Sequence, residues 1–197
     1  MPERKPLNHT GTIQLETERL NLRRTSLSDA EQMYDNWASD PDVTKYLVWE
    51  THANIDVTRE ILTGWNEKYG NSDFYHWGIV EKESQQIIGT VGTHRLDEKH
   101  YSMELGYCMS RAYWGKGYMS EAVAAIIEYL FNTVGFNRIS ACHDTDNIGS
   151  GRVMQKCGMI LEGTQRQVRY NIKRGGFINL IWYAILKSDY DKNNVRG

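Results

Sequence analysis

Residues 114–121 read Trp-Gly-Lys-Gly-Tyr-Met-Ser-Glu and stand at the start of a run with helical apolar spacing. The apolar positions of that run are Met119, Ala122, Val123, Ile126, Ile127 and Leu130. The start of a helix leaves about four backbone N–H groups without intrahelical partners, and these groups carry partial positive charge. Glycines 115 and 117 lack the Cβ atoms that would keep an anion away from them. The stretch therefore predicts a phosphate or pyrophosphate cradle, with a plain glycine-rich turn before a helix as the alternative.

The segments before the cradle separate it from two common nucleotide motifs. Three strand-like runs at 75–81, 86–96 and 101–110 precede it, and their short polar linkers are typical of antiparallel hairpins. A dinucleotide fingerprint needs a parallel strand–helix–strand unit and a third glycine, whereas position 120 is Ser. A P-loop needs Gly-Lys-Ser/Thr after a four-residue spacer, and the sequence has none here. The chain is thus predicted to run through an antiparallel meander into a pyrophosphate-binding helix.

The rest of the pattern predicts one mixed α/β domain over 15–190, after a loose arm at 1–14. No repeat, low-complexity segment or linker divides it. Further strands are expected at 18–24, 138–142, 159–162, 166–172 and 177–186, and helical segments at 29–38, 40–47, 55–69, 118–131 and 148–158.

Composition narrows the class of protein. The chain has 197 residues, 40% of them hydrophobic, which suffices for a folded core. A net charge of −2 gives no general attraction to nucleic acid or to an anionic membrane, so neither DNA nor a membrane is expected as a partner. The three cysteines lie in apolar segments without metal-like spacing, so reduced thiols and no metal are expected. With no apolar leader or membrane-length run, the expected location is the cytoplasm.

The order of elements and four motifs resemble the GNAT superfamily of acyl-CoA-dependent N-acyltransferases, over about residues 15–188. The motifs are Glu-Arg-Leu-Asn-Leu-Arg at 18–23, Glu-Leu-Gly-Tyr at 104–107, Tyr-Trp-Gly-Lys-Gly-Tyr at 113–118, and Asn-Ile-Gly-Ser at 147–150 with Lys-Cys-Gly-Met at 156–159. Within the superfamily, the chain looks most like the ribosomal-protein N-terminal acetyltransferases. The resemblance implies a mixed, mostly antiparallel seven-stranded sheet flanked by helices.

The resemblance also implies acetyl-CoA as co-substrate and a set of residues that bind it. Strand 101–110 would separate from strand 138–142 at a bulge near 107–109, and the pantetheine arm would lie in the gap. The implied cofactor-binding residues are Tyr107, Cys108, Met109, Trp114, Gly115, Lys116, Gly117, Tyr118, Met119, Ser120, Asn147 and Ser150. The family's six-residue loop usually begins with Arg or Gln and ends with Gly or Ala, whereas Trp114 and Met119 stand at these positions.

The chemistry requires a neutral amine and a proton for the leaving thiolate. Glu104, on the strand that leads to the gap, is the predicted catalytic base, with a surface glutamate as the alternative interpretation. His94 and His143 are weaker candidates for the base, because a lone His near a strand end is more often structural or solvated. Many family members donate the proton from a Tyr seven residues after the asparagine of the Asn-x-x-Ser segment, but counting from Asn147 leads to Met154. Ser150 is the nearest hydroxyl and is the second predicted catalytic residue, with helix-end hydrogen bonding as its alternative role.

The acceptor is expected beside residues 40–53 and the last hairpin, 166–176. Tyr46, Trp49 and Tyr170 are the predicted substrate-binding residues, although such aromatics are more often simply core. The hairpin is rich in Arg and Lys and would suit an acidic peptide or a ribosomal RNA surface, although a charge run is usually a solvated turn.

Three functions follow from these observations. The first is transfer of acetyl to a protein N-terminal α-amine, such as that of a ribosomal protein. The second keeps the chemistry but acts on a small amine: an amino acid, a polyamine or an aminoglycoside. The third is a non-catalytic acyl-CoA-binding module. A homodimer is one option for the oligomeric state, since homodimers are common among such proteins, but no interface is identified.

Overall fold

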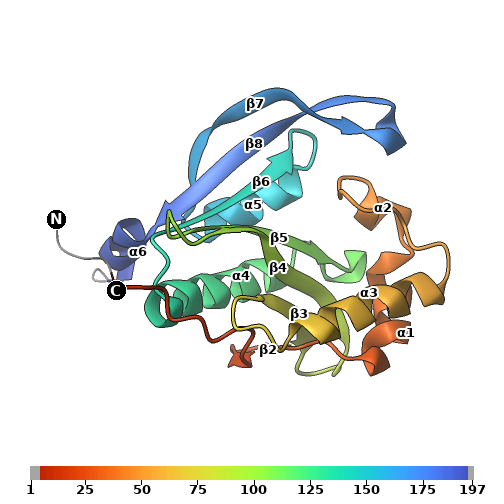
Figure 1. The fold of residues 1–197 in the computed structure, drawn as a ribbon. Helices are drawn as coiled ribbons and strands as arrows, with labels where there is room; N and C mark the ends of the chain where they lie inside the picture. The colour runs from red at the N-terminus through yellow and green to blue at the C-terminus, as the bar shows by residue number, and fades with distance from the viewer. Residues whose placement is uncertain (1–4, 195–197) are drawn as a thin grey trace.

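A sheet of eight strands, in the order β1-β2-β3-β4-β5-β6-β8-β7, forms the centre of the fold among the described residues 5–194 of this computed structural model (Figure 1). All neighbouring strands pair antiparallel except β5 and β6, which are parallel. The strands are β1 Leu15–Glu16, β2 Leu20–Arg23, β3 His76–Glu81, β4 Ile87–Asp97, β5 Ser102–Met109, β6 Arg138–Asp144, β7 Ile160–Asn171 and β8 Gly176–Leu186.

Helices cover both faces of this sheet, and each layer buries its own apolar cluster. One face carries α1 Ala30–Met33, a π-helical turn Tyr34–Ala38, α2 Pro41–Thr44 and α3 Ile55–Lys68. The other face carries α4 Tyr118–Tyr129, continued by a π-helical turn Leu130–Val134, and α5 Ile148–Lys156. Short 3-10 turns lie at Leu27–Asp29, Arg111–Tyr113 and Ile172–Arg174, and α6 Lys187–Asn194 follows β8. None of the described helices is long and apolar enough to cross a membrane.

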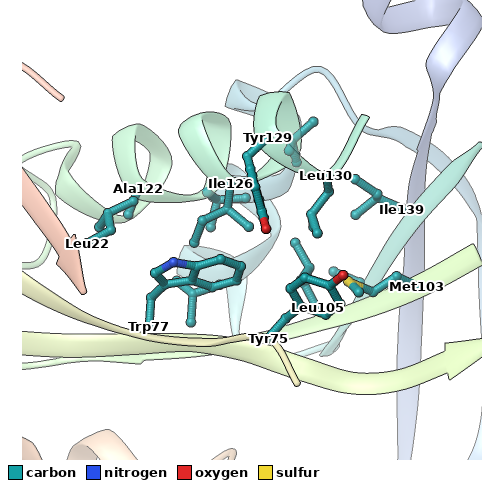
Figure 2. Close-up of a cluster of buried hydrophobic side chains, with 14 of the residues drawn as sticks. Leu22, Tyr75, Trp77, Met103, Leu105, Ala122, Ile126, Tyr129, Leu130 and Ile139 are labelled. Atoms are coloured by element: carbon teal, nitrogen blue, oxygen red, sulfur yellow. The ribbon is translucent and has the colours of Figure 1, made fainter. Parts of the chain in front are cut away.

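The larger core lies between α4 and the middle of the sheet (Figure 2). The helical spacing at the start of α4 turns Ala122 and Ile126 onto the sheet, where Trp77 and Leu105 meet them, all at most 2% exposed. On β5 the period of two sends Leu105 into this core and leaves Glu104 on the opposite face. The packing of α4 thus fixes both the cradle and the orientation of β5.

The expected mixed, mostly antiparallel sheet is confirmed, with two differences. The sheet has eight strands rather than seven, because the short β1 pairs with β2 ahead of the first expected strand. The two strands expected at 159–162 and 166–172 are one strand, β7. Its pairing with β8 shifts register at Leu161/Gly163 and at Gln165/Arg169, so irregularities bend β7 without ending it.

The segment before β1 is tied to the domain, contrary to the expectation of a loose arm at 1–14. The backbone N–H of Asn8 donates to the carbonyl of Val134 over 2.8 Å. The indole of Trp77 donates to the carbonyl of Ile13 over 2.7 Å. The expectation is therefore wrong for the stretch between Asn8 and Ile13, and residues 1–4 lie outside the described part of the chain.

Candidate active site

The glycine-rich stretch forms a tight turn at the N-terminus of α4. Gly117 is the N-cap residue with φ +85°, and Gly115 has φ +75°. These values lie in the left-handed region, which glycine adopts without the steric cost of a Cβ. The indole of Trp114 donates to the carbonyl of Met109 over 2.8 Å and ties the turn to the end of β5. The backbone N–H groups at the start of α4 are thereby held in a fixed position.

A cavity of about 540 Å³, here called the cradle cavity, lies in front of this turn. The structure brings together around it all the predicted cofactor-binding residues except Lys116: Tyr107, Cys108, Met109, Trp114, Gly115, Gly117, Tyr118, Met119, Ser120, Asn147 and Ser150. The ammonium of Lys116 instead lies 5.3 Å from the ring centre of Tyr113. Arg152 and Lys156 of α5, which sequence reasoning did not select, also line the cavity and add positive charge.

The two parallel strands separate earlier than expected. Pairing between β5 and β6 ends at Glu104 and Ser140, and no pairing follows. The irregularity lies on β4, where the register shifts between Thr93 and Arg95, whereas β5 pairs regularly with β4 over 107–109. The expected bulge at 107–109 is therefore wrong, because the extra residue belongs to the neighbouring strand.

The backbone groups that face the gap follow from the antiparallel ladder. The N–H of Ser110 donates to the carbonyl of Ile88 on β4 over 2.8 Å. Because these directions alternate along a strand, the backbone of Cys108 also faces β4, while the backbones of Tyr107 and Met109 face the gap. Two of the three expected backbone positions thus face the gap, and Cys108 does not.

The start of α5 meets Tyr107 at the edge of the gap. Asn147 caps α5, and its side-chain oxygen accepts from the N–H of Ser150 over 3.3 Å. The hydroxyl of Ser150 donates to the hydroxyl of Tyr107 over 3.0 Å, and the latter donates to the carbonyl of Ser150 over 3.0 Å. Burial raises the pKa of Tyr107, against the effect of its hydrogen bond with Ser150, so the phenol stays protonated. Met154 is buried in the core and offers no proton.

A second cavity, of about 380 Å³, opens on the other side of β5 beneath the β7–β8 hairpin and is here called the hairpin cavity. Glu104 lines it, and the thiol of Cys142 lies 3.7 Å from a Glu104 carboxylate oxygen. Trp49 and Tyr46, two of the predicted substrate-binding residues, also line it. Six residues line both cavities, so the two meet at the strand gap: Tyr46, Leu47, Tyr107, Cys108, Asn147 and Ser150.

Tyr170, the third predicted acceptor residue, lines neither cavity. It is 53% exposed and packs against Phe177, with ring centres 5.2 Å apart. This prediction is wrong about the side of the hairpin, because Tyr170 lies on the outer face.

The basic tip of the hairpin is neither free nor simply solvated. Lys173 donates to the carbonyls of Thr44 and Trp49, over 2.9 and 2.8 Å, and so joins the hairpin to the loop after α2. Arg174 forms ion pairs with Asp144, over 2.7 Å, and with Asp146. In Figure 1 the hairpin extends beyond the other strands toward α2. The two hydrogen bonds of Lys173, here called the Lys173 bridge, thus connect the hairpin to the segment that carries Trp49, which lines the hairpin cavity.

Two histidines of the hairpin cavity are held in the neutral form. Burial lowers the pKa of His76 to about 3, and its ring packs at a tilt against Trp65 with ring centres 3.8 Å apart. Burial also lowers the pKa of His52, whose Nδ1 lies 2.7 Å from the hydroxyl of Thr58. The described residues contain no group of three or more His, Cys, Asp or Glu side chains placed to hold a metal ion.

Arg19 is a site residue that sequence reasoning missed. Its side chain binds Glu121 in the first turn of α4, and its Nη1 donates to the carbonyl of Lys116 over 3.1 Å. Arg19 belongs to the motif at 18–23, which was a signal that it matters. Its role could not be read from that motif, because its partners lie about a hundred residues later in the chain.

Comparison with known proteins identifies the family. Residues 19–160 match the family model described as Acetyltransferase (GNAT) domain. The chain is 33% identical over 176 residues to the uncharacterized N-acetyltransferase p20 of Bacillus licheniformis, covering 89% of this chain and 97% of that protein. It is 27% identical over 159 residues to the ribosomal protein uS5-alanine N-acetyltransferase of Escherichia coli strain K12, covering 77% and 80% of the two chains. The crystal structure of a GNAT-family acetyltransferase from Bacillus anthracis matches with a TM-score of 0.77 at 28% identity, covering 89% of this chain and 99% of that one.

The fold is that of an N-acetyltransferase. The chain belongs to the GNAT acetyltransferase family. Enzymes of this family use acetyl-CoA.

Proposed function

We propose that this acetyltransferase transfers the acetyl group of acetyl-CoA to the α-amine at a protein N-terminus. The observation that carries the proposal is the meeting of the two cavities at the strand gap, with Glu104 on the acceptor side. A co-substrate in one cavity and an amine in the other would bring their reacting atoms together at that junction.

The cradle cavity suits acetyl-CoA. The backbone N–H groups from Gly115 to Ser120 would bind the pyrophosphate, helped by the positive end of the α4 dipole. The pantetheine arm would lie in the strand gap, where the backbones of Tyr107 and Met109 and the side chain of Asn147 offer hydrogen bonds. The positive φ values of the two glycines support this assignment, because they aim the N–H groups at the cavity without a Cβ in the way.

The chemistry assigns a separate role to each side of the junction. The amine nitrogen attacks the acetyl carbon, forming the C–N bond and breaking the C–S bond, while Glu104 accepts the proton released by the amine. A backbone N–H facing the gap would stabilise the negative charge that develops on the carbonyl oxygen. The hydroxyl of Ser150 would donate a proton or a hydrogen bond to the leaving thiolate, and the hydroxyl of Tyr107, which lies 3.0 Å away, would replace or share that proton.

An α-amine suits this site better than a lysine side chain. The pKa of an α-amino group is about 7.7–8.0 and that of lysine is about 10.4, so the α-amine loses its proton more easily to a carboxylate. The Escherichia coli relative that is named an alanine N-acetyltransferase of ribosomal protein uS5 gives independent support. A small-molecule amine is the second candidate, because the hairpin cavity, of about 380 Å³, is of a size that also fits a small ligand.

Thiol release from acetyl-CoA tests the function with two pools of acceptors. One pool holds peptides that begin with Ser or Ala, and the other holds polyamines, amino acids and aminoglycosides. Release with the peptides supports the proposal, and release with only the second pool replaces it by the small-molecule function. No release with either, combined with a rise in Tm on adding acetyl-CoA, would favour a non-catalytic binding module.

Glu104→Gln tests the base. We expect kcat to fall by about 10²–10⁴-fold, with the Kd for CoA unchanged. Glu128→Gln, at an exposed position on α4, makes the same charge change and should leave kcat unchanged. Equal turnover in the wild type and Glu104→Gln would remove Glu104 from the mechanism.

A further inference from the structure

Arg169 enters the hairpin cavity from β7, one residue before the position predicted from sequence. It pairs with Ile178 on β8, which is 7% exposed, and lines the cavity together with Leu180. Tyr170 pairs with the 65% exposed Phe177 on the outer face. Paired residues of an antiparallel ladder point to the same face, so Arg169 is on the inner face of the hairpin. The shift of register between Leu161 and Gly163, where β7 carries one extra residue, sets which side chains of β7 face inward, and the two extra residues between Gln165 and Arg169 keep that alternation.

The guanidinium of Arg169 has no hydrogen-bond or ion-pair partner in the part of the chain that the structure describes. The other basic residues at this end of the hairpin are engaged, Lys173 by two carbonyls and Arg174 by two carboxylates. Arg169 is also the sole Lys or Arg among the described residues that line the hairpin cavity. A half-buried guanidinium normally binds a carboxylate or phosphate, for which its fork of donors is suited.

Among the charged side chains of the described residues that line the hairpin cavity, Arg169 is a positive group and Glu104 a negative group without an ion-pair partner. The carboxylate of Asp144 is already paired with Arg174 over 2.7 Å. His52 and His76 are neutral near pH 7, because burial lowers the pKa of each. Glu104 remains as the uncompensated carboxylate among the described lining residues. Glu104 and Arg169 both lie within electrostatic reach of the Cys142 thiol, whose pKa is raised to about 12 by burial and by Glu104, against the effect of Arg169.

We propose that Arg169 binds a carboxylate of the acceptor, so that the enzyme selects amines that carry a carboxylate close by. This proposal rests on the proposed function, in which Glu104 receives the amine. An acceptor of this kind places its ammonium toward Glu104 and its carboxylate toward Arg169, so that each of its charges meets the opposite charge of the cavity. The carboxylate comes either from an acidic side chain next to a peptide N-terminus or from the α-carboxyl group of a free amino acid.

Acceptors matched in size that differ in this charge test the proposal, with kcat/KM referred to the concentration of neutral amine, because loss of the carboxylate also lowers the pKa of the amine. The peptide amides Ser-Glu-Ala-Ala and Ser-Gln-Ala-Ala form one pair, and serine and serinamide form the other. We expect kcat/KM to favour the charged member of at least one pair by about tenfold or more, and which pair it is identifies the source of the carboxylate. Equal kcat/KM within both pairs, or a preference for the neutral members, would overturn the proposal.

Substitution of Arg169 separates recognition from a structural role. In Arg169→Gln the KM for the charged acceptor should rise about tenfold while its kcat and the kinetics of the neutral acceptor stay unchanged, and Arg169→Lys should recover part of the loss. Arg166→Gln, an exposed arginine of the same strand that does not line the cavity, should have no effect. An equal loss for both members of a pair would show that Arg169 supports the fold and not the acceptor.

Calorimetric binding of the same four compounds to the CoA-loaded protein gives a readout that needs no turnover. Tighter binding of a charged member to the wild type than to Arg169→Gln would uphold the carboxylate site even if no acetyl transfer occurred, in which case the proposed function alone would have failed. Binding to neither protein, together with transfer to other, uncharged amines, would reject the carboxylate site and leave the transferase function intact.

Discussion

The guanidinium of Arg19 donates from Nε to a carboxylate oxygen of Glu121 over 2.7 Å, and the backbone N–H of Arg19 donates to the other oxygen over 2.9 Å. Burial alone would raise the pKa of Glu121, but the hydrogen bonds from Thr17 and Arg19 lower it. This carboxylate is therefore charged, and both of its oxygens accept hydrogen bonds. Arg19 also contacts the carbonyl of Lys116 and the ring of Tyr118, whose centre is 4.2 Å away. Arg19, near the start of the domain, thus holds the turn before α4 through Lys116 and the first turn of α4 through Tyr118 and Glu121.

Arg19→Met should weaken binding of CoA. The cradle would lose the hydrogen bond to its Lys116 carbonyl and the fixed position of the first turn of α4, so we expect the Kd for CoA to rise about tenfold, as for loss of one charged hydrogen bond. Isothermal titration with CoA measures this. Arg59→Met, which removes only an exposed ion pair with Asp56, is the control and should leave the Kd unchanged. A Kd in Arg19→Met equal to that of the wild type would show that the cradle keeps its shape without the clamp.

Lys173→Met should affect the acceptor and not CoA. The substitution removes both hydrogen bonds between the hairpin and the loop after α2, so the cover of the hairpin cavity loses its fixed position. We expect the KM for the acceptor to rise severalfold, with the Kd for CoA within a factor of about two of the wild type. Lys68→Met makes the same change on the exposed end of α3 and should alter neither quantity. If CoA binding fell as much as acceptor binding, the bridge would be part of the cradle.

The free energy of unfolding should fall below pH 6.5 because of His76. Its pKa in the folded chain is about 3, lowered by burial from an ordinary value of 6.5, so the unfolded chain takes up the proton first. The stabilisation from the neutral ring is complete above pH 6.5 and is lost as the pH falls toward 3. It amounts to about 1.4 kcal/mol between pH 7.5 and pH 5.5.

Urea unfolding at these two pH values measures the fall in the free energy of unfolding. This fall should be smaller in His76→Gln than in the wild type. The carboxylates with lowered pKa, Glu121 and Asp29, lose their contribution only at lower pH, so they do not obscure the comparison. His94→Gln, at an exposed histidine of β4, is the matched control for the loss of an imidazole. An unchanged pH dependence in His76→Gln would mean that the ring can be protonated without leaving its packed position.

Local spacing made the cradle and the meander predictable. The two glycines before an apolar helical run, and the period of two on the strands, are properties of neighbouring residues, and the structure places α4 and β3 to β5 close to the expected positions. Alternation along β5 also predicted that Glu104 lies on the face opposite the core-facing Leu105, whereas its role as the base is a prediction from the family resemblance. The sequence could also exclude Met154 as a proton donor, since a thioether has no proton to give.

Contacts between distant residues could not be predicted in this way. The hydroxyl that meets Ser150 comes from Tyr107, on a strand that lies forty-three residues earlier in the chain. The clamp between Arg19 and Glu121 joins residues more than a hundred positions apart. Sequence patterns report which face a residue takes on its own element, but the pairing of elements sets which faces meet.

The sequence by itself determined the order of the elements, the glycine turn before α4 and the position of the carboxylate on β5, because each depends on local backbone geometry and hydrophobic period. Only the tertiary structure decided which side of the hairpin faces the hairpin cavity. A change of register in β7 puts Arg169 inside and Tyr170 outside, and nothing in the local sequence shows where pairing with β8 shifts. The same holds for Lys173 and Arg174, whose partners are brought near only when the hairpin folds over the cavity.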